Sequence, residues 1–476
     1  MFDRILTRRA APAPADPTEA PRSRFSEDAA PPPAAAPTIA PTIVMGEDGA
    51  GGRSDYIALK VSLHQKLLET MNLQIIDKLP PEQFRAEVGA MLRDIFAAEP
   101  IPLNGQERAR LVDDLLDELL GLGPIEPLLK DPTVSDILVN AASSVYVERG
   151  GRLEPTTVKF KDNRHLLRII NKIVSAVGRR IDESQPLVDA RLADGSRVNA
   201  VCAPIAIDGP LLSIRKFSKK PLHLEKLVEV GALTPQMADL LQAVVRGRLN
   251  VLISGGTGSG KTTMLNAMSR FIDGAERIVT IEDAAELQLQ QPHVARMETR
   301  PPNIEGRGEI AQRELVKNAL RMRPDRIIVG ECRGSEAFDM LQAMNTGHDG
   351  SMTTVHANTC RDAVSRLEQM IGMTGMDLPL KTIRAQIASA IDVIIQLERM
   401  SDGRRRMTSV HEIVGMEGDV VTMQEIFHFR RDRTEADGTI RGTFWATGIR
   451  PKFLPDLKAR GLDLDPELFS PDRPLA

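Results

Sequence analysis

The chain has 476 residues, which is room for two or three domains with sizeable hydrophobic cores. Its 61 basic and 65 acidic residues give a net charge of −4, and only 3% of the residues are aromatic. This composition argues against direct binding of nucleic acid, which needs a basic surface and stacking side chains. The three cysteines form no CxxC pair, so we expect neither a disulfide framework nor a cysteine zinc site, and a reducing cytosol fits.

The first 52 residues predict neither a membrane anchor nor a folded domain. The opening MFDRILTRR is too highly charged for a signal peptide, and the chain lacks a stretch of about 18 apolar residues that would predict a membrane span. We therefore expect a cytoplasmic protein whose role at the membrane is peripheral. Residues 1–52 are Ala/Pro-rich and lack periodicity, which predicts a disordered tail, either an inert tether or a docking arm.

Residues 53–127 have a helical pattern. In LVDDLLDELL, which begins at Leu111, apolar pairs recur every four residues and acidic residues occupy the positions between them. This spacing predicts an amphipathic helix, and Gly121 is expected to end it. We predict a small helical module.

Residues 128–218 predict a small α/β domain. VSDILVN and PLLSIRKF are typical of strands, whereas NRHLLRIINKIVSAVGRR is an amphipathic helix. The polar stretch 219–232 is expected to be a linker. At the far end of the chain, the Pro-rich residues 451–476 predict a C-terminal tail.

A second α/β unit, residues 233–450, contains GGTGSGKTT between the apolar strand LNVLIS and a helical segment. Glycines allow successive backbone N–H groups to turn toward phosphate oxygens, and the helix N-terminus adds positive charge. Lys261 is expected to bridge the β- and γ-phosphates of a nucleoside triphosphate, and the Thr262 hydroxyl to hold Mg²⁺. The predicted nucleotide-binding residues are Gly255, Gly256, Thr257, Gly258, Ser259, Gly260, Lys261, Thr262 and Thr263.

An acidic cluster follows the next strand. RIVTIEDAAELQL places Glu282 and Asp283 at the end of an apolar run and Glu286 within one helical turn. Carboxylates in this position suit Mg²⁺ bound to a nucleotide, directly or through water. The alternative is a helix start whose acidic residues favour the helix dipole.

A further apolar strand, in RPDRIIVGECRG, ends at Glu331. A carboxylate at the tip of a strand beside the phosphate loop is placed to orient and activate the attacking water. Phosphate-loop proteins usually carry a magnesium-binding aspartate on this strand, but Gly330 takes that place here. The acidic cluster is expected to supply the missing acid.

Two histidines flank the β-rich run in GHDGSMTTVHAN. We assign His348 and His356 to sensing the γ-phosphate rather than to a metal, because no third ligand has suitable spacing. The alternative is that both are structural residues.

These motifs, in this order, resemble those of the secretion ATPase superfamily that powers type II and type IV secretion and type IV pili. Its members carry a phosphate loop, an acidic box, a strand ending in Gly-Glu and a histidine box. Upstream, GLGPIEPLLKDPTVSDILVN, LADGSRVNA and LLSIRKF are similar to the branch serving tight-adherence (Flp) pili, the CpaF proteins. The resemblance covers roughly residues 56–450.

The resemblance implies an α/β architecture in which a helical module and a PAS-like N-terminal domain are flexibly linked to a RecA-like ATPase domain, assembled as a homo-hexamer. It also implies that Arg197 and Arg215 reach the nucleotide from the N-terminal domain as arginine fingers. The alternative for each is a surface salt bridge. Arg321 and Arg323 are weaker candidates for contacts between subunits.

The function expected from this resemblance is that of an ATP- and Mg²⁺-dependent motor. It would drive assembly of a tight-adherence pilus, with retraction left open, through platform proteins of the inner membrane. One alternative is a type IV secretion ATPase that exports macromolecules. A second is a nucleic-acid translocase on the same core, and the composition argues against it. The last is a non-enzymatic nucleotide-binding scaffold, against which Glu331 argues because binding alone does not require a base.

Overall fold

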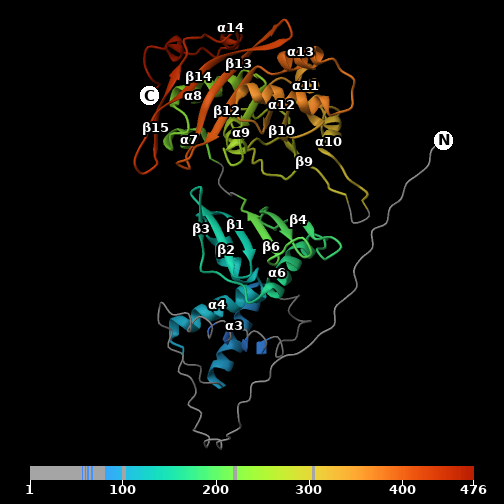
Figure 1. The fold of residues 1–476 in the computed structure, drawn as a ribbon, viewed down its shortest axis with the longest axis vertical. Coiled ribbons are helices and arrows are strands. Elements are labelled where there is room, and N and C mark those ends of the chain that lie inside the picture. Colours follow the sequence, from blue (N-terminus) through green and yellow to red (C-terminus); the bar gives the residue numbers. More distant parts are fainter. Residues whose placement is uncertain are drawn as a thin grey trace, which may run out of the picture.

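The computed structural model describes residues 81–98, 103–217, 222–302 and 306–475, with a few residues between 56 and 67. The predicted Ala/Pro-rich tail, residues 1–52, lies outside the described residues. In Figure 1 the helical module, an N-terminal sheet domain and a larger C-terminal domain follow one another along the long axis.

The helical module contains α3 (Pro81–Ala98) and α4 (Gly105–Leu119). Leu111 and Leu115 of α4 are fully buried, as the four-residue spacing predicts, and pack with Leu92 of α3. Short helices η1 (Gly123–Ile125) and α5 (Glu126–Lys130) lead to the sheet domain.

A buried ion pair joins the module to the next domain. The Glu118 carboxylate at the end of α4 lies 2.5 Å from His165 Nε2 and 3.2 Å from Lys60 Nζ. Burial acts to raise the pKa of Glu118, but the hydrogen bond with His165 and the charge of Lys60 outweigh it and lower that pKa to about 2.

The N-terminal domain is an antiparallel sheet in the order β3-β2-β1-β6-β5-β4, covered by α6 (Asn163–Ala176). Alternate strand residues and the apolar face of α6 form its core. The strands are β1 (Val134–Ala141), β2 (Ser144–Arg149), β3 (Arg152–Pro155), β4 (Leu187–Arg191), β5 (Arg197–Val201) and β6 (Leu211–Arg215).

One edge of this sheet carries charged residues from several strands. Because neighbouring strands are antiparallel, the end of β2 at Glu148, the end of β6 at Arg215 and the start of β5 at Arg197 lie at the same edge. Arg191, at the end of β4, is paired in register with Arg197. Figure 1 shows this edge turned toward the C-terminal domain.

The C-terminal domain has a mixed sheet in the order β15-β14-β13-β12-β7-β11-β10-β8-β9. The segment from β12 to β9 is parallel, and β13 to β15 continue it as antiparallel strands. The strands are β7 (Val251–Gly255), β8 (Ile278–Glu282), β9 (Val294–Glu298), β10 (Arg326–Cys332), β11 (Met352–Val355), β12 (Val393–Arg399), β13 (Arg405–Glu417), β14 (Val420–Thr434) and β15 (Ile440–Ala446).

Two hydrophobic cores lie on opposite faces of this sheet. Val251 and Ile253 of β7 belong to one core and Leu252 to the other, as strand alternation requires. The first core packs under α7 (Leu224–Glu229), α8 (Pro235–Arg246), α9 (Lys261–Ser269), α14 (Leu454–Ala459) and η2 (Pro466–Phe469). The second packs under α10 (Gln312–Ala319), α11 (Glu336–Asn345), α12 (Cys360–Gly372) and α13 (Leu380–Ala390).

The structure differs from the expected linker and C-terminal tail. Residues 218–221 lie outside the described residues, but α7 follows at once and buries Leu224 and Leu227 in the first core. At the other end, Phe453 and Phe469 are buried in the same core. Residues 222–232 and 451–475 are therefore parts of the C-terminal domain, because their few apolar residues fall where the sheet offers a surface to cover.

Candidate functional site

The phosphate loop joins β7, whose residues are all buried, to the N-terminus of α9. Gly258 and Gly260 have φ of +70° and +98°, the left-handed region that favours glycine. A Cβ atom on Gly255 would lie 2.4 Å from Ser259 Oγ and 2.5 Å from the Leu397 carbonyl oxygen. The glycine spacing is thus required by backbone geometry and by close approach of β12.

Lys261 points back into this loop. Its Nζ donates hydrogen bonds to the carbonyl oxygens of Gly255 (3.0 Å) and Gly256 (3.2 Å) and lies 4.0 Å from Glu331 Oε1. Burial lowers the pKa of Lys261, and the Glu331 carboxylate opposes that effect. The ammonium is therefore inside the loop, where phosphate oxygens can replace the carbonyl partners.

Glu331 lies on β10, at the same carboxyl edge of the parallel sheet as the phosphate loop. Its Oε2 accepts a hydrogen bond of 2.7 Å from Arg333 Nη2. The other guanidinium nitrogen, Nη1, lies 3.5 Å from Asp283. Arg333 joins the two acidic stretches, and sequence reasoning missed it although it stands two residues after the predicted base.

Glu282 is anchored rather than free. It is 2% exposed, and its Oε1 accepts hydrogen bonds from the N–H groups of Glu286 and Leu287, both at 2.7 Å. Burial raises the pKa of Glu282 to about 7, against the lowering effect of these hydrogen bonds. Gly330 leaves room beside it, because a Cβ atom there would make a tight contact of 3.1 Å with Glu282 Cγ.

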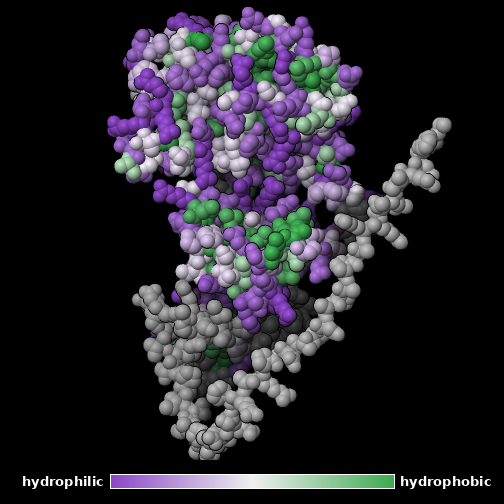
Figure 2. Space-filling view, viewed as in Figure 1, coloured by the Kyte–Doolittle hydropathy of each residue, from purple (hydrophilic) through white to green (hydrophobic). Residues whose placement is uncertain are grey.

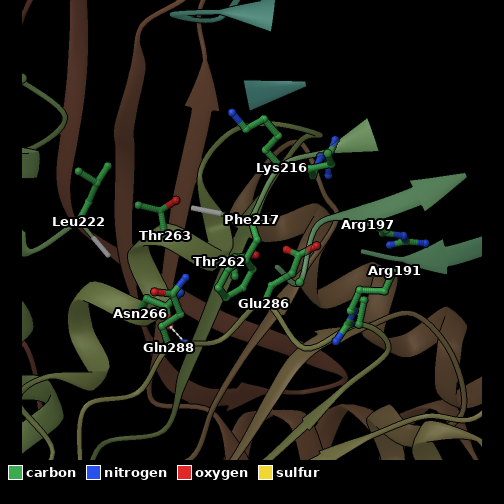
Figure 3. A pocket seen from close by; sticks show the side chains of 13 residues that line it. Arg191, Arg197, Lys216, Phe217, Leu222, Thr262, Thr263, Asn266, Glu286 and Gln288 are labelled. Atoms are coloured by element: carbon green, nitrogen blue, oxygen red, sulfur yellow. Dashed lines mark hydrogen bonds between the residues drawn. The ribbon is translucent and has the colours of Figure 1, made fainter. Parts of the chain in front are cut away.

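A cleft between the two domains is lined by several more of the predicted residues. Arg197 and Arg215 line it from the N-terminal domain. Thr262, Thr263 and Glu286 line it from the C-terminal domain, and Figure 3 labels these three residues and Arg197. The structure therefore brings both arginines to the phosphate loop of their own chain. The rest of the lining consists of apolar, amide and basic residues: Phe217, Leu222, Gly195, Ala284, Asn266, Gln288, Arg191 and Lys216.

The two arginines are cross-strand partners in register on β5 and β6. Arg215 Nε donates to Asp136 Oδ1 at 3.2 Å, yet its side chain is 58% exposed and retains donors for a ligand. Arg191 makes a bidentate pair with Glu298 of β9, at 3.0 and 2.8 Å. Sequence reasoning did not find this bridge between domains, since its partners are over a hundred residues apart.

The structure separates the two histidines. His356 follows the C-terminus of β11, at the edge that carries the phosphate loop, and is exposed. His348 precedes β11, at the opposite edge, where its Nδ1 lies 3.2 Å from the Ala343 carbonyl oxygen. A parallel strand places its two ends at opposite edges of the sheet, so His348 is not brought to the phosphate loop.

Arg321 and Arg323 follow α10, far along the chain from the cleft lining. Arg321 contacts the Lys317 carbonyl oxygen at 3.4 Å, and Arg323 has a left-handed φ of +52°. Their expected role in subunit contacts stays a prediction.

The residues at the loop fit a magnesium ion that keeps water and nucleotide oxygens among its ligands. Thr262 and Glu286 offer oxygen donors, and the buried Glu282 Oε2 has no hydrogen-bond partner among the described residues. Within the described part of the chain, no three His, Cys, Asp or Glu residues could hold a metal on protein ligands alone.

The fold and the site define the class of protein. A glycine phosphate loop at the carboxyl edge of a parallel sheet, beside a strand-end glutamate and facing arginines, is the arrangement of a phosphate-loop ATPase. None of the helices in the described ranges is long and apolar enough to cross a membrane.

Comparison with known proteins gives the family. A family model described as "Type II/IV secretion system protein" matches residues 118–433. A putative conjugal transfer protein of Mycobacterium tuberculosis is 40% identical over 329 residues, covering 68% of this chain and 92% of the relative. The chain therefore belongs to the type II/IV secretion system family and is an ATPase. The ATPase activity predicted from the motifs is thus confirmed.

Further similarities are to named conjugal transfer and type IV secretion proteins. Conjugal transfer protein TrbB of Rhizobium radiobacter is 32% identical over 320 residues, 65% of this chain and 90% of the relative. A solved structure of the VirB11 ATPase from the Brucella suis type IV secretion system, in complex with sulphate, is 28% identical. That alignment has a TM-score of 0.33 and covers 60% of this chain and 94% of the other. These relatives are named for conjugal transfer and type IV secretion.

Proposed function

We propose that the chain is the ATP-hydrolysing motor of a type IV secretion-type machine that exports macromolecular substrates. The observation that carries the proposal is the meeting of Arg197 and Arg215 with the phosphate loop across the cleft between two domains. A site shared by two domains can convert nucleotide turnover into domain movement. The conjugal transfer names of the relatives support the choice of machine.

The proposed chemistry assigns each residue one task. Lys261 exchanges its loop carbonyls for the β- and γ-phosphate oxygens of ATP. Glu331 orients the attacking water, once the nucleotide draws Lys261 away from it. Arg197 and Arg215 stabilise charge that develops on the transferred phosphoryl group.

We assign the magnesium site to Thr262, with Asp283 and Glu286 acting through water. The ion, when bound, neutralises charge on the β- and γ-phosphates. Glu282 supports the site by fixing the backbone between these acids, through its hydrogen bonds to Glu286 and Leu287. His356, at the same sheet edge, is the better placed of the two histidines to sense the γ-phosphate.

The proposed assembly is a hexameric ring at the cytoplasmic face of the inner membrane, held there by platform proteins. Its N-terminal domains would be PAS-like and its ATPase domains RecA-like, joined by the short segment around residues 218–221. Near-neutral charge and few aromatic residues favour protein partners over direct contact with nucleic acid.

Assembly of a tight-adherence pilus is the second candidate. The observation that favours it is the similarity of GLGPIEPLLKDPTVSDILVN and LLSIRKF to the N-terminal domain of the pilus branch. Both candidates use the same engine and differ in the machine it drives.

The proposal is tested in two steps. Lys261→Ala should abolish ATP hydrolysis and weaken ATP binding, because the phosphates lose their buried ammonium partner; turnover near that of the wild type would exclude this loop as the site. A strain lacking the protein is then complemented with the wild type or with Lys261→Ala. Export that fails while surface pili persist supports secretion, and the reverse supports the pilus.

A further inference from the structure

The turn between β12 and β13 lies over the phosphate loop. β12 pairs with β7 in parallel, with Leu397 opposite Gly255, so the residues that follow β12 continue past the start of the loop. Arg399 ends β12 and Arg405 begins β13. Two guanidinium groups therefore lie against the phosphate loop, on the side away from Lys261.

Arg405 contacts the loop backbone directly. Its Nε donates a 2.8 Å hydrogen bond to the Gly258 carbonyl oxygen. In a trans peptide the C=O and N–H groups point in opposite directions. The bond from Arg405 to the Gly258 carbonyl oxygen therefore turns the N–H of Ser259 toward the side of the loop on which Lys261 lies. There it donates to the Gly256 carbonyl oxygen at 3.3 Å, the oxygen that Lys261 also contacts. Arg405 thus helps to orient a backbone donor toward the place where phosphate would lie.

A carboxylate from the other domain lies between the two arginines. Glu148 Oε1, on β2, is 3.8 Å from Arg399 Nη2 and 3.9 Å from Arg405 Nη2, and its side chain is only 16% exposed. Two neighbouring guanidinium groups repel one another, and a shared carboxylate offsets that repulsion. Figure 2 shows hydrophilic residues where the two domains approach each other.

The tip of the β2–β3 hairpin is shaped for this contact. Arg399 Nη2 donates a hydrogen bond to the carbonyl oxygen of Gly151. Gly151 has a φ of +85°, and a Cβ atom there would lie 3.3 Å from Arg399 Nη2. A glycine at this position therefore lets the N-terminal domain reach the turn that touches the phosphate loop.

We propose that Arg405 and Arg399 are positioning residues of the phosphate loop and that Glu148 of the N-terminal domain sets their place. Docking of that domain then tightens nucleotide binding by fixing the loop, in addition to delivering Arg197 and Arg215. The inference rests on the proposal that this loop binds ATP.

The test is a mutant cycle read by the KM for ATP, kcat, and the affinity for fluorescently labelled ADP. Arg405→Ala should raise KM about tenfold, the scale of losing a charge-assisted hydrogen bond, while kcat changes less than KM. Glu148→Gln should raise KM about threefold, because its ion pairs are longer and partly exposed. In a chain that already carries Arg399→Ala and Arg405→Ala, Glu148→Gln should have no further effect.

Arg404→Ala and Glu154→Gln are matched controls: Arg404 is exposed beside Arg405, and Glu154 pairs at 3.6 Å with Arg149 on the neighbouring strand. Both should keep wild-type KM. A threefold effect of Glu148→Gln in both backgrounds, or a wild-type KM for Arg405→Ala, would overturn the inference. So would equal losses of kcat and thermal stability with KM unchanged, which a merely structural role would give. An active Lys261→Ala protein would instead overturn the proposed nucleotide site itself.

Discussion

At the scale of single residues, the strand-end carboxylates divide into two roles that the sequence does not separate. Glu331 is partly exposed and lies between Lys261 and Arg333, whereas Glu282 is buried and accepts two backbone hydrogen bonds. Both follow apolar strands, so their local patterns are alike. Burial and neighbours decide what each can do.

Glu331→Gln should keep ATP bound and slow turnover by about a hundredfold or more, the scale of losing a general base. Glutamine keeps the size and the hydrogen-bond acceptor but cannot take a proton. Single-turnover hydrolysis measured beside nucleotide affinity checks this. A collapse of affinity would instead make Glu331 a magnesium ligand.

Glu282→Gln should fold well and gain stability over the wild type as pH rises. The folded pKa of Glu282 is about 7, above the ordinary value of 4.5. The stability that the protonated carboxyl group gives to the folded protein is therefore fully present below pH 4.5. It is lost, by about 3 kcal/mol in total, as pH rises through 7. Glutamine does not titrate, and its carbonyl oxygen can accept the same two N–H groups. Urea unfolding at pH 5 and pH 8 measures the difference, and an equal difference at both pH values would contradict the assignment.

Much of the site was predictable from local sequence, because the loop with its lysine and each strand-end acid are marked by a pattern of a few neighbouring residues. Arg333 and the Arg191–Glu298 and Glu148–Arg405 pairs were not. Each of the latter two joins strands from different domains, and their spacing in the chain carries no signal. The structure brings His356 but not His348 to the edge of the sheet that carries the phosphate loop, although the two histidines are close in the chain. They are eight residues apart, and a short strand between them sends one to each edge of the sheet.

At the scale of elements, the sequence predicted the amphipathic helices and the buried strands. It did not predict that segments rich in polar residues would pack into the core. The spacing in LVDDLLDELL and the apolar run LNVLIS correspond to α4 and β7. The C-terminal residues looked like a tail because prolines and charges outnumber apolar residues there. Phe469 nevertheless stacks on Phe427 with ring centroids 6.0 Å apart, in the core beneath the antiparallel strands.

Phe469→Ala should destabilise the protein by about 3 kcal/mol, the usual cost of removing a buried aromatic ring. Lys458→Ala, at a largely exposed side chain in the same segment, is the control and should change the free energy of unfolding by less than about 0.5 kcal/mol. Chemical denaturation of both variants gives the comparison. Equal, small effects would mean that residues 451–475 do not contribute to the core.

At the scale of the whole molecule, the proposed site combines the phosphate loop and Glu331 of the ATPase domain with Arg197 and Arg215 of the N-terminal domain. A sheet edge carrying Glu148, Arg191, Arg197 and Arg215 faces the cleft. The order of the motifs predicted a two-domain ATPase. It could not place one domain against the other, because that arrangement depends on ion pairs between distant residues.

The most direct test of this account is the effect of Arg197→Ala and Arg215→Ala on phosphate release, measured beside ATP affinity. Arginine fingers act on charge that develops in the transition state, whereas Lys261 and the loop backbone supply most of the ground-state binding. We predict turnover lower by about a hundredfold or more with ATP affinity within a few-fold of the wild type. Lysine should rescue poorly, because a point charge cannot reproduce the planar fork of arginine. Arg152→Ala, at an exposed arginine on the edge strand β3 of the same sheet, should leave turnover unchanged. Full turnover in the Arg197→Ala and Arg215→Ala proteins would contradict the central claim that the N-terminal domain completes the catalytic site.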